Sequence, residues 1–166
     1  LMKLRLIKMK SVKSTNDTAI RLIKKNQFKP TLITSANQRK GRGTMGKKWI
    51  SMKGNLFISI FFEINSKKIN FKQFAILNAY LIRKIISRYT SEKIDIKWPN
   101  DLLIKKQKVC GILQEIIDYK EKKFLIVGTG INTNSSPNIV NFKTTSLRNR
   151  SKKHIDSNKI LKDVKK

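Results

Sequence analysis

The chain contains one cysteine and one histidine, and these shortages exclude several classes of protein. Because Cys110 is alone, no disulfide can form within the 166 residues, and a reducing, cytoplasmic setting is expected. His154 lies in a polar stretch near the C-terminus, which disfavours hydrolases that depend on a histidine base. Since no histidine is near it in sequence, Cys110 is expected to be a small buried residue rather than a nucleophile.

The sequence also lacks a long apolar run. The longest, LFISIFF at residues 56–62, is far too short to span a membrane. The basic N-terminal stretch is interrupted by Lys or Arg every two or three positions, so it has no apolar signal-peptide core. No repeat, linker or low-complexity block divides the chain, and we expect a single domain over residues 1–166.

Acidic residues are scarce: ten Asp and Glu stand against 38 Lys and Arg, for a formal net charge of +28. Such a charge is typical of nucleic-acid-binding proteins. The lysines, however, are spread from Lys3 to Lys166, which favours a drift in composition over a dedicated binding surface. Aromatic residues such as Phe57 and Phe61 lie in apolar runs rather than between basic residues. We therefore expect no specific nucleic-acid partner and no membrane partner, while a basic nucleic-acid-binding module stays open as an alternative of a different class.

The hydrophobic pattern alternates between strands and helices. Strands are predicted at residues 4–9, 31–36, 55–64, 93–98 and 124–130, with two more around a polar turn at 105–107. Helices are predicted at 14–26, where Ser14 is an N-cap and Asp17 its capping-box partner, at 70–89, where Asn70 is a candidate N-cap, and more weakly near 157–166. Strands in runs, with helices early and late, predict an α+β fold with one mixed or antiparallel sheet and helices packed on one face.

The stretch KGRGTMGKK at residues 40–48 fits two nucleotide-binding fingerprints. Both the dinucleotide fingerprint and the phosphate loop need a helix to open after the glycines, and the sequence that follows predicts a strand instead. The phosphate loop also requires Ser or Thr where Lys48 stands. A third interpretation is a loop whose free backbone N–H groups and Arg42, Lys47 and Lys48 wrap an anion. From this segment alone, a mobile basic surface loop is an equal alternative.

Three further segments place polar groups at element ends. KWPND at residues 97–101 sets a cation, an amide and a carboxylate beside a proline, although an ordinary turn would look the same. A hairpin would return Lys108 beside this corner. GTGIN at 128–132 offers close backbone approach to a ligand. STN at 14–16 supplies hydroxyls and an amide, although capping alone explains Ser14.

The order of these segments resembles the catalytic domain of biotin–protein ligases, of the monofunctional type without a DNA-binding domain. The resemblance covers residues from about 10 to the C-terminus. It implies a fold like that of class II aminoacyl-tRNA synthetases. It also implies that biotin and Mg-ATP form biotinyl-5′-adenylate and pyrophosphate. A lysine of the biotin carboxyl carrier protein of acetyl-CoA carboxylase then takes the biotin and releases AMP.

The resemblance also implies which residues form the site. It implies that Lys108, Arg42 and Asp101 are catalytic, with Lys108 gripping the biotin carboxylate and the α-phosphate. Trp49 is expected near the adenine. No metal-ligand motif is present, and Mg²⁺ is expected to enter with ATP, near Asp101. The implied biotin and adenylate contacts are Ser14, Thr15, Asn16, Gln38, Gly41, Arg42, Gly43, Thr44, Trp49, Lys97, Asn100, Lys108, Gly111, Gly130 and Asn132.

The sequence departs from the family pattern in its loop and at its ends. A second arginine usually follows GRG, and here that position is Thr44, so one charge-assisted contact to the adenylate is missing. We expect the small C-terminal β-barrel of the family to be absent or truncated, and no repressor role, since no helix-turn-helix precedes the domain. A lipoate ligase or octanoyl transferase of the same fold, and a catalytically inactive biotin binder, stay open as alternatives. Either a monomer or a homodimer is expected.

Overall fold

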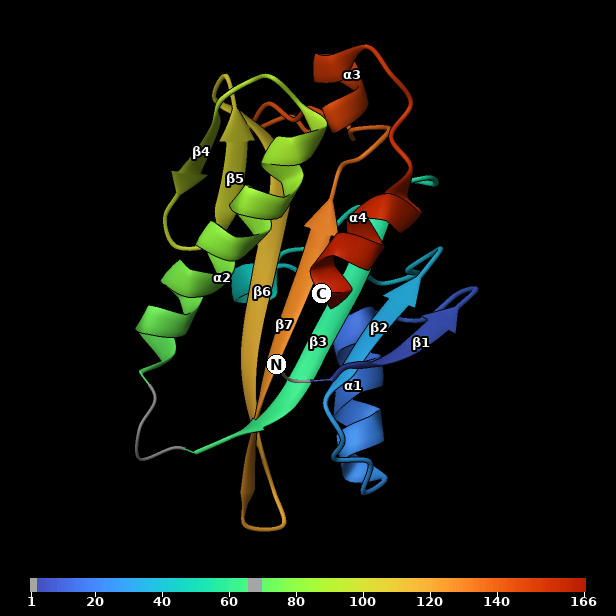
Figure 1. The fold of residues 1–166 in the computed structure, drawn as a ribbon, viewed down its shortest axis with the longest axis vertical. Helices are drawn as coiled ribbons and strands as arrows, with labels where there is room; N and C mark the ends of the chain where they lie inside the picture. The colour runs from blue at the N-terminus through green and yellow to red at the C-terminus, as the bar shows by residue number, and fades with distance from the viewer. Residues whose placement is uncertain (1–2, 66–69) are drawn as a thin grey trace.

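The structure is a computed structural model that describes residues 3–65 and 70–166. Within these ranges one sheet has seven strands in the order β1-β2-β3-β7-β6-β5-β4 (Figure 1). β1 and β2 pair in parallel and the other neighbours are antiparallel, so the predicted mixed sheet and α+β class are confirmed. The strands are β1 Arg5–Met9, β2 Thr31–Ser35, β3 Leu56–Ile64, β4 Ile94–Lys97, β5 Asp101–Ile104, β6 Gln107–Tyr119 and β7 Lys122–Ile131.

Side-chain caps set where the helices begin. Ser14 accepts a hydrogen bond from the backbone N–H of Asp17 at 3.0 Å, and Asn70 accepts one from Lys72 at 2.9 Å, as the sequence predicted. The short helix α3 was not predicted, because five residues show no apolar period. The helices are α1 Thr15–Lys24, α2 Phe71–Ile86, α3 Leu147–Ser151 and α4 Ser157–Lys165, with short 3₁₀ turns at Thr44–Gly46 and Ser87–Tyr89. In the described ranges no helix has the length and apolar character that crossing a membrane requires.

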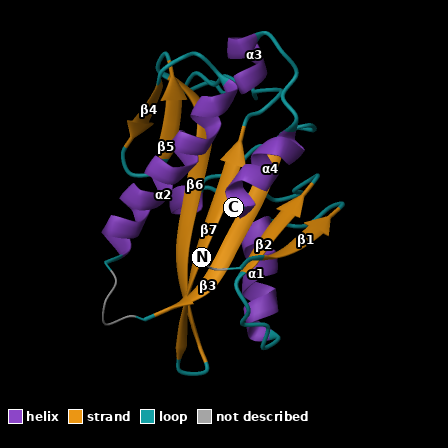
Figure 2. Cartoon of the chain, in the orientation of Figure 1, coloured by secondary structure: helices purple, strands orange, loops and turns teal. Residues whose placement is uncertain are grey.

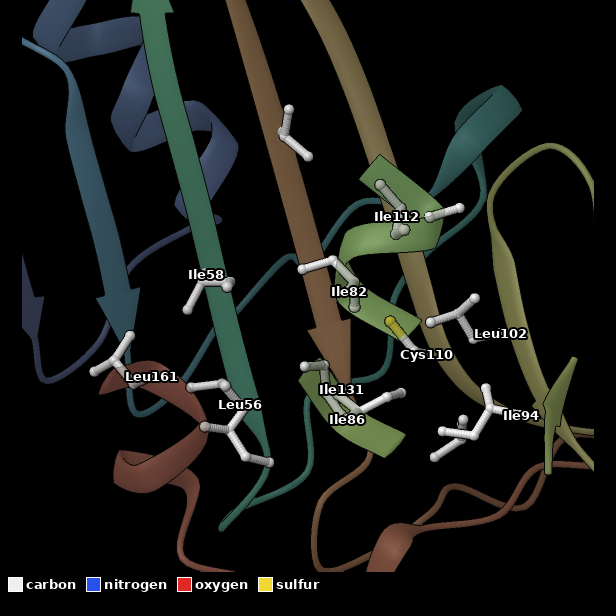
Figure 3. Close-up of a cluster of buried hydrophobic side chains, with 14 of the residues drawn as sticks. Leu56, Ile58, Ile82, Ile86, Ile94, Leu102, Cys110, Ile112, Ile131 and Leu161 are labelled. Atoms are coloured by element: carbon white, nitrogen blue, oxygen red, sulfur yellow. The ribbon is translucent and has the colours of Figure 1, made fainter. Parts of the chain in front are cut away.

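The sheet is covered by helices on both faces. Alternate side chains of β7 face opposite ways, so Phe124 and Ile126 pack with Ile23 of α1, whereas Leu125 packs with Ile82 of α2. Figure 3 shows the larger of the two clusters, and α2 and α4 cross the same face of the strands in Figure 2. The expectation that helices share one face therefore holds for α2 and α4 only. A strand that is buried on both faces has apolar residues at successive positions, and the FLIV stretch of β7 fits this pattern.

A polar contact ties the end of α2 to α4. The Tyr89 hydroxyl donates to Asp163 Oδ2 at 2.8 Å, and Arg88 and Lys166 lie 3.5 Å and 3.1 Å from the same carboxylate. Burial and the hydrogen bond to Asp163 raise the pKa of Tyr89 from 10.0 to about 12. The hydrogen bonds from Tyr89 and Lys166 lower the pKa of Asp163 below its ordinary value.

These two pKa shifts predict a pH-dependent contribution to stability. The contribution of Tyr89 is present below its ordinary pKa of 10.0 and is lost as the pH rises to about 12. The contribution of Asp163, whose pKa is lowered, is present above its ordinary pKa and is lost as the pH falls through the folded value. Urea unfolding should therefore show a stability gap between the parent protein and Tyr89→Phe that is constant near neutrality and shrinks at both extremes. A gap that does not vary with pH would contradict this account.

Candidate functional site

A cavity of about 570 Å³ lies at the N-terminal end of α1, over the glycines of β6 and β7. Gly111 of β6 pairs in register with Gly130 of β7, and Gly128 pairs with Leu113 two residues along. The missing side chains let Asn16, Trp49 and Lys108 lie close against the sheet. The walls come from the start of α1, from the glycine-rich loop at residues 41–49 and from residues 137–144. A cavity of this size suits a small molecule.

The structure brings most of the predicted site residues to this cavity, although their roles stay predictions. Gly41 and Lys97 do not line it, and Asp101 is next to it through an ion pair. The predicted residues that line it are Ser14, Thr15, Asn16, Gln38, Arg42, Gly43, Thr44, Trp49, Asn100, Lys108, Gly111, Gly130 and Asn132.

Lys108 projects from β6 and meets Asp101 of β5. Its Nζ lies 2.7 Å from Asp101 Oδ1, and both side chains are about four-fifths buried, with 19% of each exposed. The prediction that a hairpin brings Lys108 back beside Asp101 is therefore confirmed. The ammonium group also lies 5.5 Å from the centre of the Trp49 ring and 5.7 Å from that of Phe142. A cation is thus held at the cavity between one carboxylate and two aromatic faces.

The Trp49 indole packs directly against the glycine pair. A Cβ atom at Gly130 would stand 2.4 Å from the indole, and one at Gly111 would stand 2.8 Å from it, so only glycine admits the ring at either position. The indole Nε1 is buried and has no hydrogen-bond partner among the described residues. An acceptor atom on a ligand could satisfy this donor. The structure gives Trp49 a place on the cavity floor, and its expected contact with adenine stays a prediction.

Polar side chains at the start of α1 are held by hydrogen bonds within the protein. Gln38 Oε1 accepts from the Thr15 backbone N–H at 2.8 Å and from its hydroxyl at 3.1 Å. The Ser59 hydroxyl donates to Asn16 Oδ1 at 2.5 Å. Asn16 lies directly over Gly128, where an added Cβ would be 2.2 Å from Asn16 Oδ1. This end of the cavity is therefore a preorganised set of hydroxyls and amides.

The glycine-rich loop folds back on itself and is not followed by a helix, as the sequence predicted. Trp49 donates its backbone N–H to the Gly41 carbonyl at 2.9 Å, and Gly43 donates to the Lys47 carbonyl at 2.7 Å. Gly41 therefore supports the base of the loop rather than the cavity wall. Met45 at the tip has a left-handed backbone, with φ 53°. Lys47 and Lys48 line the cavity and make no ion pair within the described ranges.

Arg42 is held by two carboxylates outside the loop. Its Nη1 and Nη2 atoms donate to Glu115 at 2.9 Å and 2.8 Å, and its Nε lies 3.0 Å from Asp17 Oδ1. The hydrogen bond to Glu115 is the main cause that raises the pKa of Arg42, with both carboxylates adding attraction. The sequence had placed Asp17 as a helix cap and had not singled out Glu115.

The remaining predicted residues differ in their placement. Asn100 donates to the Ile112 carbonyl at 3.2 Å and lies 3.4 Å from the Thr44 hydroxyl, so it links the loop to β6. Asn132 is buried and donates to the Thr145 carbonyl at 3.1 Å. Lys97 is exposed on the edge strand β4, outside the cavity, because its strand position faces solvent. Cys110 is fully buried, and burial raises the pKa of its thiol, as expected for a residue that is not a nucleophile.

Residues 137–144 form a wall that the sequence did not predict. Their backbone reaches the cavity because Lys108 and Thr144 form an isolated bridge, with Lys108 N–H donating to the Lys143 carbonyl at 2.9 Å. Phe142 is the aromatic residue that this wall places against Lys108. The stretch carries no motif, so only the contact with β6 could have identified it.

Metal-ligand side chains do not cluster within residues 3–65 and 70–166. No three His, Cys, Asp or Glu side chains within them lie together as metal ligands would. Asp101, which was expected near Mg²⁺, pairs with Lys108, and the expected ion stays a prediction.

Comparison with known proteins agrees on the family. Residues 9–132 match the model of the biotin/lipoate A/B protein ligase family. The bifunctional ligase/repressor BirA of Bacillus subtilis is 35% identical over 127 residues, which make up 75% of this chain and 39% of that protein. The biotin--[acetyl-CoA-carboxylase] ligase of Mycobacterium tuberculosis is 26% identical over 122 residues, 70% of this chain and 44% of the relative. This chain therefore spans less than half the length of either relative.

Solved structures support the same assignment. The biotin protein ligase from Aquifex aeolicus in complex with biotin and ATP matches with a TM-score of 0.80 at 33% identity, over 97% of this chain and 67% of that one. A bipartite lipoate protein ligase from Thermoplasma acidophilum matches with a TM-score of 0.66 at 9% identity, over 99% of this chain and 81% of that one, which shows a shared fold alone. Because the family match covers most of its length, the chain belongs to the biotin/lipoate A/B protein ligase family.

Proposed function

We propose that this chain is an ATP-dependent biotin–protein ligase. The observation that carries the proposal is the cavity floor, where Lys108 lies beside the Trp49 indole that Gly111 and Gly130 admit against the sheet. A cavity with a fixed cation beside an aromatic ring suits a compact apolar acid. The biotin complex of the Aquifex aeolicus relative supports the choice of substrate. The lipoate or octanoate alternative rests on a likeness of fold.

The residues present fit an activation step that needs charge more than acid–base groups. In that step a biotin carboxylate oxygen attacks the α-phosphorus of ATP, an acyl–phosphate bond forms, and pyrophosphate leaves. Both reactants are anions, so Lys108 would neutralise them as they approach, and the glycine-loop N–H groups and the free Lys47 and Lys48 would attract the phosphates. Magnesium, in this proposal, is a companion of the nucleotide phosphates rather than an ion held by the protein.

In the second step an acceptor lysine would replace AMP. The neutral amine attacks the acyl carbon, an amide bond forms, the acyl–phosphate bond breaks, and the amine proton goes to solvent. The name of the Mycobacterium tuberculosis relative supports a carrier subunit of acetyl-CoA carboxylase as the acceptor. A net charge of +28 would favour encounter with an acidic carrier.

The test is transfer of biotin to a purified biotin carboxyl carrier domain, with ATP and with the acceptor lysine replaced by arginine as the control. The proposal expects label on the parent carrier, none on the control, and none without ATP. Transfer of lipoate with no transfer of biotin would move the assignment to the sister activity.

Because Thr44 stands where the family usually has an arginine, we expect activated biotin to leak from this site. Thr44 makes a weak contact with Asn100 at 3.4 Å and brings no positive charge to the cavity. An arginine at this position would add a charge-assisted bond to the adenylate phosphate, typically worth about 1.5–3 kcal/mol. We expect Thr44→Arg to lower biotinylation of a non-cognate protein, such as serum albumin, by about tenfold or more. Thr44→Ser should label albumin as the parent does, and equal labelling by the arginine variant would refute the idea.

A further inference from the structure

Arg42 carries the only side chain of the glycine-rich loop that the described contacts tie to both α1 and β6. Two of its donors are bound to Glu115, and the third lies against Asp17. Two carboxylates thus surround one guanidinium group, so its charge is more than balanced locally. The three side chains are about a quarter to a third exposed, which leaves the pairs only partly screened by water.

Glu115 is itself held in place by the start of α1. Its Oε2 accepts a hydrogen bond from Asn16 Nδ2 at 2.7 Å, in addition to the one from Arg42. Asn16 is fixed by Ser59 and by the Leu113 carbonyl, on the two strands that flank Gly128. The Glu115 carboxylate is therefore oriented by Asn16 as well as by Arg42.

We propose that Glu115, assisted by Asp17, is a positioning residue that closes the glycine-rich loop over the cavity by holding Arg42. In this role Arg42 holds the loop closed and is not the cation that meets the nucleotide phosphates. We call the contact of Arg42 with Glu115 and Asp17 the latch. Lys108, Lys47 and Lys48 are the cavity cations left for that purpose. The effect on catalysis rests on the proposed ligase activity, but the latch itself does not.

Charge as well as distance favours this positioning role for Glu115 and Asp17. The chain has ten acidic residues against 38 basic ones, yet two of the ten meet at one loop arginine. Were Arg42 meant to face a phosphate, a neighbouring pair of carboxylates would repel that ligand. The same pair is suited to hold an arginine in a fixed plane, since a carboxylate accepts both Nη donors at once.

The first test measures the loop without any substrate. Limited trypsin digestion should cut after Lys47 and Lys48 about tenfold faster or more in Glu115→Gln than in the parent, because a bond between charged groups is lost. Glu115→Asp, which keeps the charge, should restore most of the protection. Glu63→Gln is the matched control: it removes a β3 carboxylate that pairs with Lys122 of β7, and neither residue belongs to the loop or lines the cavity.

A second test separates positioning from chemistry. Biotin-dependent pyrophosphate exchange should show KM for biotin raised about tenfold in Glu115→Gln, with kcat little changed and rescue by Glu115→Asp. The double variant Arg42→Gln/Glu115→Gln should be no more sensitive to trypsin than either single variant. Unchanged trypsin protection in Glu115→Gln, or a loss of kcat with KM and protection unaltered, would overturn the proposal. If the parent shows no exchange with biotin while Glu115→Gln still exposes the loop, the ligase assignment fails and the latch stands.

Discussion

Replacing Lys108 by alanine is expected to reduce biotin-dependent pyrophosphate exchange by about a hundredfold or more, the usual cost of removing a group that stabilises charge in the transition state. In the structure Lys108 is the cation set against both the Trp49 indole and the Asp101 carboxylate. Without it, two anions would have to approach each other beside an unpaired Asp101. The loss should appear in kcat as well as in kcat/KM, because the interaction strengthens as the acyl–phosphate bond forms.

Two companion variants make this result interpretable. Lys106→Ala removes an exposed lysine of the adjoining turn and should leave exchange intact. The double variant Lys108→Ala/Asp101→Asn removes the unpaired carboxylate, so any loss of stability caused by that carboxylate should be recovered while exchange stays lost. Exchange within threefold of the parent in a folded Lys108→Ala protein would show that another group carries the charge.

Gly128→Ala is the second substitution with a large expected effect. An added Cβ would lie 2.2 Å from Asn16 Oδ1 and 2.8 Å from its Cγ, which is far inside contact distance. Asn16 cannot move aside cheaply, since Ser59, Glu115 and the Leu113 carbonyl all bind it. We expect the free energy of unfolding to fall by about 1–3 kcal/mol, from overpacking and from lost buried hydrogen bonds. Exchange should fall with it, because the start of α1 lines the cavity.

Urea unfolding and pyrophosphate exchange check this prediction together. Gly43→Ala makes the same chemical change where φ is −113° and the nearest atom would be 3.3 Å away, so its stability should change by less than about 1 kcal/mol. Adding Asn16→Ala to Gly128→Ala should recover part of the stability, because the clash disappears, but should not recover exchange. A Gly128→Ala protein as stable as the parent would mean that Asn16 has room that the structure does not show.

Much of the fold follows from local pattern. The period of three to four at residues 70–89 marks α2, and Asn70 and Ser14 mark where helices begin, because capping depends on one side chain and its neighbours. The faces of the sheet do not follow in the same way. FLIV in β7 is apolar at every position, so its sequence cannot tell which residue meets α1 and which meets α2.

The residues of the candidate site differ in the same way: some follow from local sequence, and others only from the assembled fold. Lys108 and Asp101 could be paired from sequence because one short hairpin joins them. Glu115 lies 73 positions from Arg42, and Phe142 lies 34 positions beyond Lys108, so only the assembled sheet brings these partners together. Lys97 lies outside the cavity for a local reason: Asn100 lines the cavity after Pro99, whereas Lys97 itself stays on an exposed edge strand. Motifs thus identified residues of the cavity, while the groups that hold those residues in place required the fold.

The measurement that tests the central claim most directly is exchange of labelled pyrophosphate into ATP, with biotin, octanoate and lipoate as parallel acids. This exchange reports formation of the acyl-adenylate and needs no carrier protein. The account predicts exchange with biotin, none with octanoate or lipoate, and loss in Lys108→Ala. Exchange with octanoate or lipoate but not with biotin, or with none of the three acids from well-folded protein, would contradict it.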